Sequence, residues 1–396
     1  MYLRGSGRRV SVGLRTLCAA ALVVVLAVSC AATRRPESAP AASASDASSP
    51  GVPARSPALA EASCPADSLR SLATARRFDI GIGGLIQSNR YMVRDSMASQ
   101  TLRCAATVIT NNGFYWSAVE PRQGSFSFAQ ADEISAWAQA NGVAQRGHVL
   151  VWHNSLPAWL EHGSFTGDEL RSILKTHIQA IVSRYRGKIR AWDVVNEAVD
   201  DRGNLRDTLW LRALGSDFIE LSFRWAHEAD PDALLFYNDY RNEGAGVVPE
   251  RIYSLVRDLK ARAVPIHGVG LQMHLIGGRE TMYATNRPAA LAEMAANLKR
   301  LGDLGLQVHV TEMDVSLVKL TEVDKLAQQA AIYGDIARTC VAAPRCTALV
   351  TWGLDDAHSW ITGRYAGSDT DAPLLYDRGL RPKPAHDAIR AVLALR

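Results

Sequence analysis

The stretch RAWDVVNE, residues 190–197, decides how this chain folds, because a short β-branched run ends in two polar side chains. A second stretch, QVHVTEMD at residues 307–314, alternates polar and apolar residues and also delivers a glutamate near its C-terminal end. Strands separated by helical patterns close most simply into a parallel α/β sheet or barrel, where functional groups gather at the C-terminal ends of the strands. We therefore expect Glu197 and Glu312 to face one cleft.

Short strand-like runs and helical patterns alternate from residue 63 onward, eight of each. The expected strands span residues 79–83, 107–110, 144–151, 190–195, 233–238, 268–273, 307–311 and 347–352. The clearest helix begins with a capping box formed by Thr166 and Glu169, continues with apolar residues at helical spacing, and stops at Gly187. Eight strand and helix pairs in roughly 330 residues predict an α/β fold, a single (β/α)8 TIM barrel at residues 63–396.

The first 62 residues do not belong to this barrel. Residues 1–29 read as a signal peptide, because four arginines precede the apolar run at residues 17–28, which is too short for a comfortable membrane span. Residues 30–62 are rich in Ala, Ser and Pro, and such a composition buries too little apolar surface to offset the entropy of ordering. This segment is expected to be a disordered tether.

Cys30 follows the residues AVS at positions 27–29, a pattern that resembles a bacterial lipoprotein cleavage box. In such a box the cysteine becomes the lipidated N-terminus. The alternative is ordinary signal cleavage near Ala31 or Ala32, with loss of Cys30. Both readings predict export from a bacterial cell, with the protein either secreted or anchored to the outer face of the membrane.

Composition and charge exclude several kinds of partner. The 396 residues are 47% hydrophobic and 21% charged, as in a globular protein. The formal charge of +4 equals the contribution of the four leader arginines, so the remaining chain has no net charge. An excess of basic residues that would favour binding to nucleic acid is therefore absent from its composition. No HExxH motif or Cys-x-x-Cys pair is present, and we expect no metal, no cofactor and a monomeric chain.

Four cysteines remain outside the leader, and an even number in an exported chain favours disulfides. Cys340 and Cys346 close a loop that holds Pro344 and form the more strongly expected pair. Cys64 and Cys104 are then expected to pair by elimination.

Two carboxyl groups across a cleft are what glycosidic bond cleavage requires, since one protonates the leaving oxygen and the other meets the positive charge at the anomeric carbon. Six motifs carry a resemblance at this point: WDVVNEA, HVTEMDV, RGHVLVWH, GVGLQMH, YNDY and TWGLDDAHSW. They resemble family 10 of the glycoside hydrolases, the endo-β-1,4-xylanases, in that family's order from about residue 78 to the C-terminus. The resemblance implies a retaining enzyme that hydrolyses internal β-1,4-xylosidic bonds of xylan or xylo-oligosaccharides by double displacement.

The resemblance also implies roles for individual residues. Glu312 would be the nucleophile, and Glu197 the acid and then the base. His274 and Asp314 would support the nucleophile, and Asn196 would bind the sugar 2-hydroxyl. Further substrate contacts are expected from Asn112, His148, Trp152, Asn238, Gln272, Trp352 and Trp360. The Cys340 and Cys346 pair has a counterpart in the family.

The chain departs from the family pattern at positions that normally grip the glycone sugars. Where the family usually has Glu-Asn-x-x-Lys-Trp, this chain reads NNGFYW at residues 111–116, so Asn111 and Tyr115 replace the charged pair. Where the family has glutamine after Trp-His-Ser, the chain reads WHNS and ends in Ser155. Our hypothesis is that the chemistry is kept while glycone recognition is altered or weakened.

Two alternatives follow from these departures and from the leader. One is a barrel glycosidase with altered glycone specificity that acts on another β-1,4-glucan or a mixed polymer. The other is a non-catalytic carbohydrate-binding lipoprotein. Retention of both glutamates, with His274 and Asp314, argues against a binder, which needs no protonated acid opposite a nucleophile.

Overall fold

The computed structural model describes residues 63–85, 90–365 and 367–395. The expected signal peptide, the tether and Cys30 lie outside these residues. Among the described helices, none combines the length and the apolar character that crossing a bilayer demands.

Eight parallel strands close into a ring because each pairs with the next and the last pairs with the first. In order they are β1 (Asp79–Ile82), β2 (Val108–Asn111), β3 (Ala144–Gly147), β4 (Ala191–Asn196), β5 (Leu234–Asp239), β6 (Gly268–Leu271), β8 (Gln307–Val315) and β9 (Cys346–Thr351). The pairing of β6 with β8 and of β9 with β1 completes the circle. The predicted (β/α)8 barrel is confirmed.

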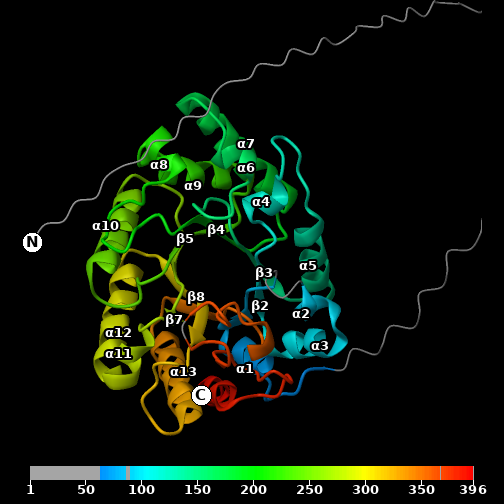
Figure 1. Ribbon diagram of the computed structural model, residues 1–396, viewed down its shortest axis with the longest axis vertical. Coiled ribbons are helices and arrows are strands. Elements are labelled where there is room, and N and C mark those ends of the chain that lie inside the picture. Colours follow the sequence, from blue (N-terminus) through cyan, green and yellow to red (C-terminus); the bar gives the residue numbers. More distant parts are fainter. Residues whose placement is uncertain (1–62, 86–89, 366, 396) are drawn as a thin grey trace, which may run out of the picture. The chain divides into compact units, whose positions relative to one another are not determined.

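Helices surround the strands, as Figure 1 shows in a view along the barrel. They are α1 (Leu69–Arg76), α2 (Tyr91–Arg94), α3 (Ser96–Ala105), α4 (Trp116–Val119), α5 (Ala129–Ala140), α6 (Ala158–Glu161), α7 (Gly167–Arg184), α8 (Leu209–Leu214), α9 (Asp217–Ala229), α10 (Val247–Ala261), α11 (Glu280–Thr285), α12 (Arg287–Asp303), α13 (Lys325–Ala342), the 3-10 turn η1 (Asp356–His358) and α14 (Pro384–Ala394). The capping box of Thr166 and Glu169 is present at the start of α7.

Two strand boundaries predicted from the sequence were wrong by four residues, and the others lie within two residues of the observed ones. The third strand ends at Gly147 instead of residue 151, because Leu150 and Val151 donate in succession to the carbonyls of β4. A regular parallel ladder uses alternate residues, so consecutive donors end it. The strand that carries Glu312 runs on to Val315, because the two-residue strand β7 (His274–Leu275) pairs with its end.

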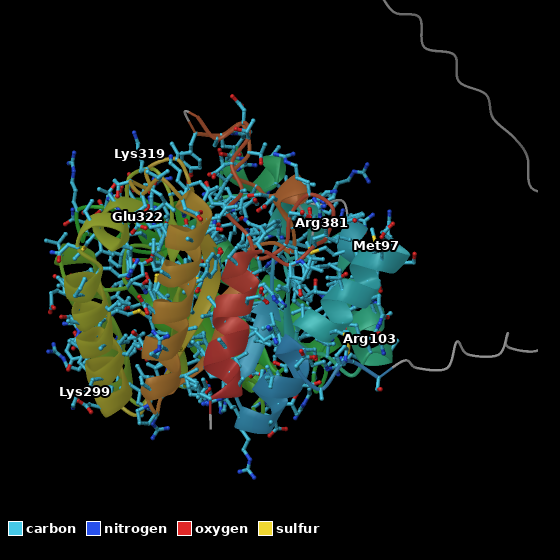
Figure 2. All side chains as sticks on the ribbon, turned by 90° about the horizontal axis from the view of Figure 1, so that it is seen from below. Met97, Arg103, Lys299, Lys319, Glu322 and Arg381 are labelled. Carbon is cyan, nitrogen blue, oxygen red and sulfur yellow. A yellow bond between two sulfur atoms is a disulfide. The ribbon has the colours of Figure 1, made fainter. Side chains whose placement is uncertain are left out.

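The two ends of the barrel are seen side-on in Figure 2. Lys319 and Glu322, which follow β8, lie at one end, and Lys299, near the end of α12, lies at the opposite end. The residues that follow the parallel strands gather at the Lys319 end, where the chemistry of such barrels is found.

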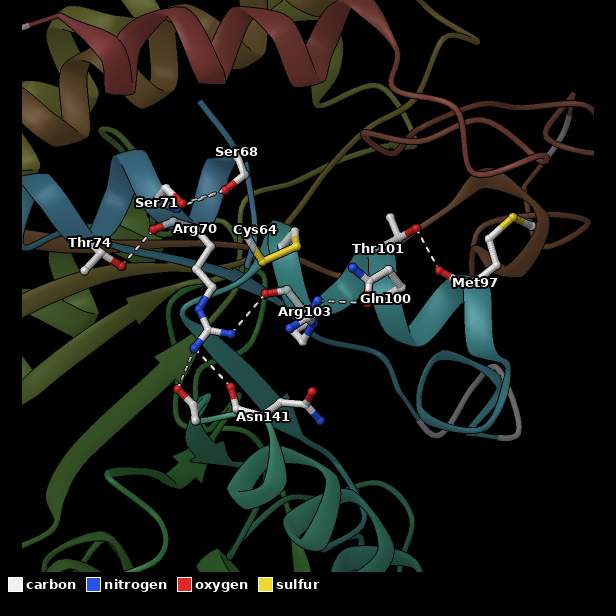
Figure 3. The surroundings of a disulfide bond; sticks show 12 residues. Cys64, Ser68, Arg70, Ser71, Thr74, Met97, Gln100, Thr101, Arg103 and Asn141 are labelled. Carbon is white, nitrogen blue, oxygen red and sulfur yellow. Dashed lines mark hydrogen bonds between the residues drawn. A yellow bond between two sulfur atoms is a disulfide. The ribbon is translucent and has the colours of Figure 1, made fainter. Parts of the chain in front are cut away.

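Disulfides connect Cys64 with Cys104 and Cys340 with Cys346. Figure 3 shows the first of them beside Arg70, whose guanidinium donates to the backbone carbonyls of Arg103, Asn141 and Gly142 at 2.9–3.1 Å. The bond and these contacts hold the start of the described chain against α3 and the end of α5.

Candidate active site

A cleft of about 410 Å³ opens at the C-terminal ends of the strands. Most of the site residues expected from the sequence line it, namely His148, Trp152, Asn196, Glu197, Gln272, His274, Glu312, Trp352 and Trp360. They come from the ends of β3, β4, β6, β7, β8 and β9 and from the loops that follow. The barrel therefore brings together residues that are up to about 210 positions apart in the chain.

Glu197 follows β4 directly, and both of its carboxylate oxygens accept hydrogen bonds. Trp152 Nε1 donates to Oε2 at 2.9 Å, and Gln272 Nε2 donates to Oε1 at 3.0 Å. The backbone of Glu197 is left-handed, with φ 55°, a conformation that costs a non-glycine residue about 1–2 kcal/mol. Its N–H donates to the Asn238 carbonyl and its own carbonyl accepts from Arg206 Nε, each at 2.9 Å. These contacts offset the strain and direct the carboxyl group into the cleft.

Glu312 lies on β8 and is more deeply set, with its side chain 6% exposed against 13% for Glu197. Asn238 Nδ2 donates to Glu312 Oε1 at 2.7 Å, and His274 Nε2 lies 3.2 Å from Oε2. The Glu312 N–H donates to the carbonyl of Gln272 at 3.1 Å. Both carboxylate oxygens are thus oriented by neighbours on other strands.

His274 is clamped between two carboxylates. The parallel register pairs it with Asp314, and His274 Nδ1 lies 2.8 Å from Asp314 Oδ2, which also accepts from Trp360 Nε1 at 2.8 Å. Burial disfavours a charge on the ring, but Asp314 and Glu312 outweigh burial and raise the pKa of His274 to about 10. The ring is therefore a cation at neutral pH, and Glu312 faces a positive charge.

Three side-chain amides connect the two glutamates. The Asn196 amide lies 2.9 Å from Asn238 Nδ2 and 3.2 Å from Gln272 Nε2. The same two amide nitrogens bind Glu312 and Glu197, respectively. A continuous chain of short contacts thus joins both carboxyl groups, and a displacement of any amide changes their mutual geometry.

His148 is positioned from inside the barrel. Its Nδ1 lies 3.0 Å from Asp193 Oδ2, the oxygen that also accepts from Arg146 Nε at 3.0 Å. Burial opposes a charge on His148, but the bond to Asp193 and the nearby Glu312 carboxylate, 4.0 Å away, raise its pKa. Arg146 supplies the opposite charge that a buried carboxylate such as Asp193 requires.

Three of the expected site residues do not line this cleft as the described residues form it. Asp314 and Asn238 are fully buried behind His274 and Glu312. Asn112 is also buried, and its Nδ2 lies 3.3 Å from the hydroxyl of Tyr115, whose ring does line the cleft. Tyr115 therefore forms part of the cleft wall in this structure, and Asn112 lies behind it.

Comparison with known proteins identifies the family. The family model described as glycosyl hydrolase family 10 matches residues 68–392. The chain belongs to this family. The endo-1,4-beta-xylanase B of Thermotoga neapolitana is 34% identical over 322 residues, which cover 81% of this chain and 90% of that protein. The endo-1,4-beta-xylanase A of Fusarium oxysporum f. sp. lycopersici is 35% identical over 280 residues, 71% of this chain and 85% of that protein.

Solved structures agree with this assignment. The crystal structure of xylanase 10B from Thermotoga petrophila RKU-1 in complex with xylobiose superposes with a TM-score of 0.76 at 35% identity, covering 82% of this chain and 97% of that one. Native xylanase 10B from Thermotoga maritima gives a TM-score of 0.74 at 35% identity, covering 82% and 98%. The resemblance recognised in the sequence is confirmed, and this family 10 chain is a glycoside hydrolase.

Sequence reasoning missed the residues that hold the segment after Glu197. Arg206 binds the carbonyls of Glu197 and Val199 and donates to the hydroxyl of Tyr240 at 2.9 Å. Asp239 accepts from Tyr237 at 2.6 Å, and burial raises its pKa well above the usual range, with the charge of Glu197 adding to the effect. The YNDY motif contained Asp239 and Tyr240, but no sequence pattern marked Arg206.

Proposed function

We propose that this family 10 hydrolase is a retaining endo-β-1,4-xylanase that cleaves internal bonds of xylan and xylo-oligosaccharides. The observation that carries the proposal is that Glu197 and Glu312 line the same cleft. The side-chain amides of Gln272, Asn196 and Asn238 link the two carboxyl groups. The relatives named as endo-1,4-beta-xylanases and the structure with bound xylobiose support xylan as the substrate.

In the first step, Glu312 attacks the anomeric carbon while Glu197 gives its proton to the departing glycosidic oxygen. The bond to the leaving sugar breaks and a glycosyl ester forms on Glu312. The cationic His274 and the amide of Asn238 support Glu312 from behind, which fits a nucleophile that must be charged and oriented before attack.

In the second step, Glu197 takes a proton from water, and the water oxygen attacks the same carbon and displaces Glu312. Two inversions return the original configuration. Asn196, which lines the cleft between the two glutamates, is the proposed partner of the sugar 2-hydroxyl, a contact that strengthens in the transition state. Trp352 and Trp360 offer apolar faces for the C–H surfaces of the sugar ring.

Proton NMR of the first products tests the reaction and its stereochemistry together. Linear xylo-oligosaccharides should yield the β-anomer first, followed by slow equilibration with the α-anomer. Immediate appearance of the α-anomer would rule out retention. Reducing-sugar release from carboxymethylcellulose or mannan, without release from xylan, would favour the rival glycosidase, and an inactive parent protein would favour the binding lipoprotein.

We also propose that the chain is exported and that Cys30 anchors it through a lipid. The disulfides Cys64–Cys104 and Cys340–Cys346 support export, because such bonds persist in oxidising compartments. Mass spectrometry of the mature N-terminus separates the options. A lipid-modified Cys30 is the expected result, and an unmodified N-terminus near Ala31 would leave secretion without an anchor.

A further inference from the structure

Two arginines line the cleft on loops apart from the strand ends that carry the glutamates. Arg279 lies between β7 and α11, and Arg364 lies after η1. Neither forms an ion pair with a carboxylate within residues 63–85, 90–365 and 367–395. Arginines that are not engaged by the protein's own acids remain available to an anionic group that enters the cleft.

Aromatic rings present both guanidinium groups to the cleft. The guanidinium of Arg279 lies 5.0 Å from the ring centre of Tyr240, and that of Arg364 lies 5.5 Å from the ring centre of Trp360. Tyr365 stands edge-on to Trp360, with 6.0 Å between the ring centres. Because all three rings also line the cleft, a sugar placed here would find apolar faces and positive charge together.

The two loops meet, so the charges lie in one region. The ring of Tyr365 reaches to within 3.9 Å of the position that a Cβ atom would take on Gly277, two residues before Arg279. Burial raises the pKa of Tyr365, and both Arg279 and Arg364 act in the opposite direction on its hydroxyl. We call the region of Arg279, Arg364, Tyr240, Trp360 and Tyr365 the arginine end.

The nearby acids Asp201 and Glu280 do not form ion pairs with either arginine of the arginine end among the described residues. Asp201 lines the cleft but pairs with Arg241 at 3.0 Å. Glu280 is buried; its Oε2 accepts from the Gly278 N–H at 2.8 Å, and its Oε1 has no hydrogen-bond partner in the part of the chain that the structure describes. One terminal nitrogen of Arg279 is buried without a hydrogen-bond partner among the described residues. An unsatisfied buried donor is unfavourable, so this guanidinium has hydrogen-bonding capacity that the described residues leave unused.

We propose that the arginine end binds the carboxylate of a uronic acid substituent on the polysaccharide chain. The guanidinium fork matches a carboxylate in geometry and charge, and the aromatic faces fit the ring that carries it. A neutral xylan backbone has no group that requires two cations. This inference rests on the proposed function and narrows it to a preference for acidic xylan.

Binding measurements on the Glu312→Gln variant test the proposal without turnover of the ligand. Three xylo-oligosaccharides of equal backbone length are compared by calorimetry: one unsubstituted, one with a glucuronic acid branch, and the same branched molecule with its carboxyl group reduced to the alcohol. The acidic ligand should bind about 10-fold more tightly than its reduced form at low salt. This advantage should shrink as ionic strength rises, because the pair is partly exposed.

The arginines are then changed in the same background. Arg364→Gln should reduce the preference for the acidic ligand roughly threefold, and the Arg279→Gln/Arg364→Gln double variant should remove most of it. Arg364 is exposed, so its variant remains informative if Arg279→Gln impairs folding. Arg251→Gln, at an exposed position of α10 outside the cleft, is the matched control and should keep the full preference.

Equal affinity for the acidic and reduced ligands, or a preference that survives the double variant, would overturn the proposal. Failure of the proposed function is read separately, in the parent protein, as absence of products from the unsubstituted xylo-oligosaccharide. A parent that cleaves unsubstituted chains but shows no preference for the acidic ligand would therefore refute only the role of the arginine end.

Discussion

The carboxylate centre and the β2 side of the cleft differ in how their polar side chains are used. At the centre, all four carboxylate oxygens of Glu197 and Glu312 have a neighbour that orients them. On the β2 side, Asn111 turns into the fold, where its amide donates to the Ala131 carbonyl at 3.1 Å and its oxygen accepts from the Gly113 N–H at 3.1 Å. The side chain of Asn111 thus binds the protein backbone and does not face the cleft.

The aromatic ring of Tyr115 occupies the cleft wall on that β2 side. It lies edge-on to His148, with 5.9 Å between the ring centres, and 5.7 Å from the ring of Trp152. Ser155 contributes its carbonyl to the Ser117 N–H at 2.8 Å, and the neighbouring Asn154 lines the cleft. Catalysis demands carboxylates held in a fixed geometry, whereas the ring of Tyr115 can offer a sugar only an apolar packing face and a hydroxyl. We therefore expect variants at the centre to lower kcat and variants on the β2 side to raise KM.

The largest effect is expected at the nucleophile. Glu312→Gln should lower kcat by about 10⁴-fold or more, since no neighbouring group replaces the attacking oxygen. Glu322→Gln is the matched control, because Glu322 is exposed at the same end of the barrel (Figure 2). Initial rates on xylan measure both. A Glu312→Gln variant that keeps more than a tenth of the parent rate would place the chemistry elsewhere.

His274, which binds Glu312 at the carboxylate centre, should make the free energy of unfolding depend on pH. Its pKa is about 10 in the folded protein and 6.5 in the unfolded chain, so its contribution is complete below pH 6.5 and is lost as pH rises through about 10. The free energy of unfolding should fall over this window by on the order of 5 kcal/mol more in the parent than in His274→Gln. Urea unfolding at several pH values measures the difference, and parallel curves would show that His274 is not held as a cation.

Asn238→Ala should lower kcat by about 30-fold, because Glu312 loses one orienting hydrogen bond and Asn196 loses a neighbour. KM should change by less than about threefold, since Asn238 lies behind the cleft wall. Steady-state kinetics on xylo-oligosaccharides separates the two constants. An effect confined to KM would contradict the positioning role of this amide.

The smallest effect is expected on the β2 side. Tyr115→Ala should raise KM for longer xylo-oligosaccharides by about fivefold with little change in kcat, because a ring that packs on sugar is removed. Tyr115→Phe keeps the ring and should stay close to the parent. If Tyr115→Ala lowered kcat as much as Asn238→Ala does, the expected difference between the β2 side and the carboxylate centre would be wrong.

Much of this arrangement could be predicted from the sequence because the signals are local. Alternation of strand and helix patterns predicted the barrel, and glutamates at two strand ends predicted the shared cleft. The end of β3 at Gly147 could not be predicted, because it depends on how Leu150 and Val151 pair with another strand. Contacts between loops, such as Arg206 with Glu197 or Tyr365 with Gly277, could not be predicted either, because no periodic pattern in the sequence indicates them.

The covalent state of Glu312 is the most direct test of the proposal that two glutamates act in turn on one sugar. A 2-fluoro xylobioside with a good leaving group forms the glycosyl ester readily but hydrolyses it slowly, so the intermediate accumulates. Peptide mass spectrometry should then find one added 2-fluoro xylobiosyl group on the peptide that contains Glu312, and none in Glu312→Gln. A label on another residue, or the α-anomer released from the natural substrate with no label at all, would contradict the account.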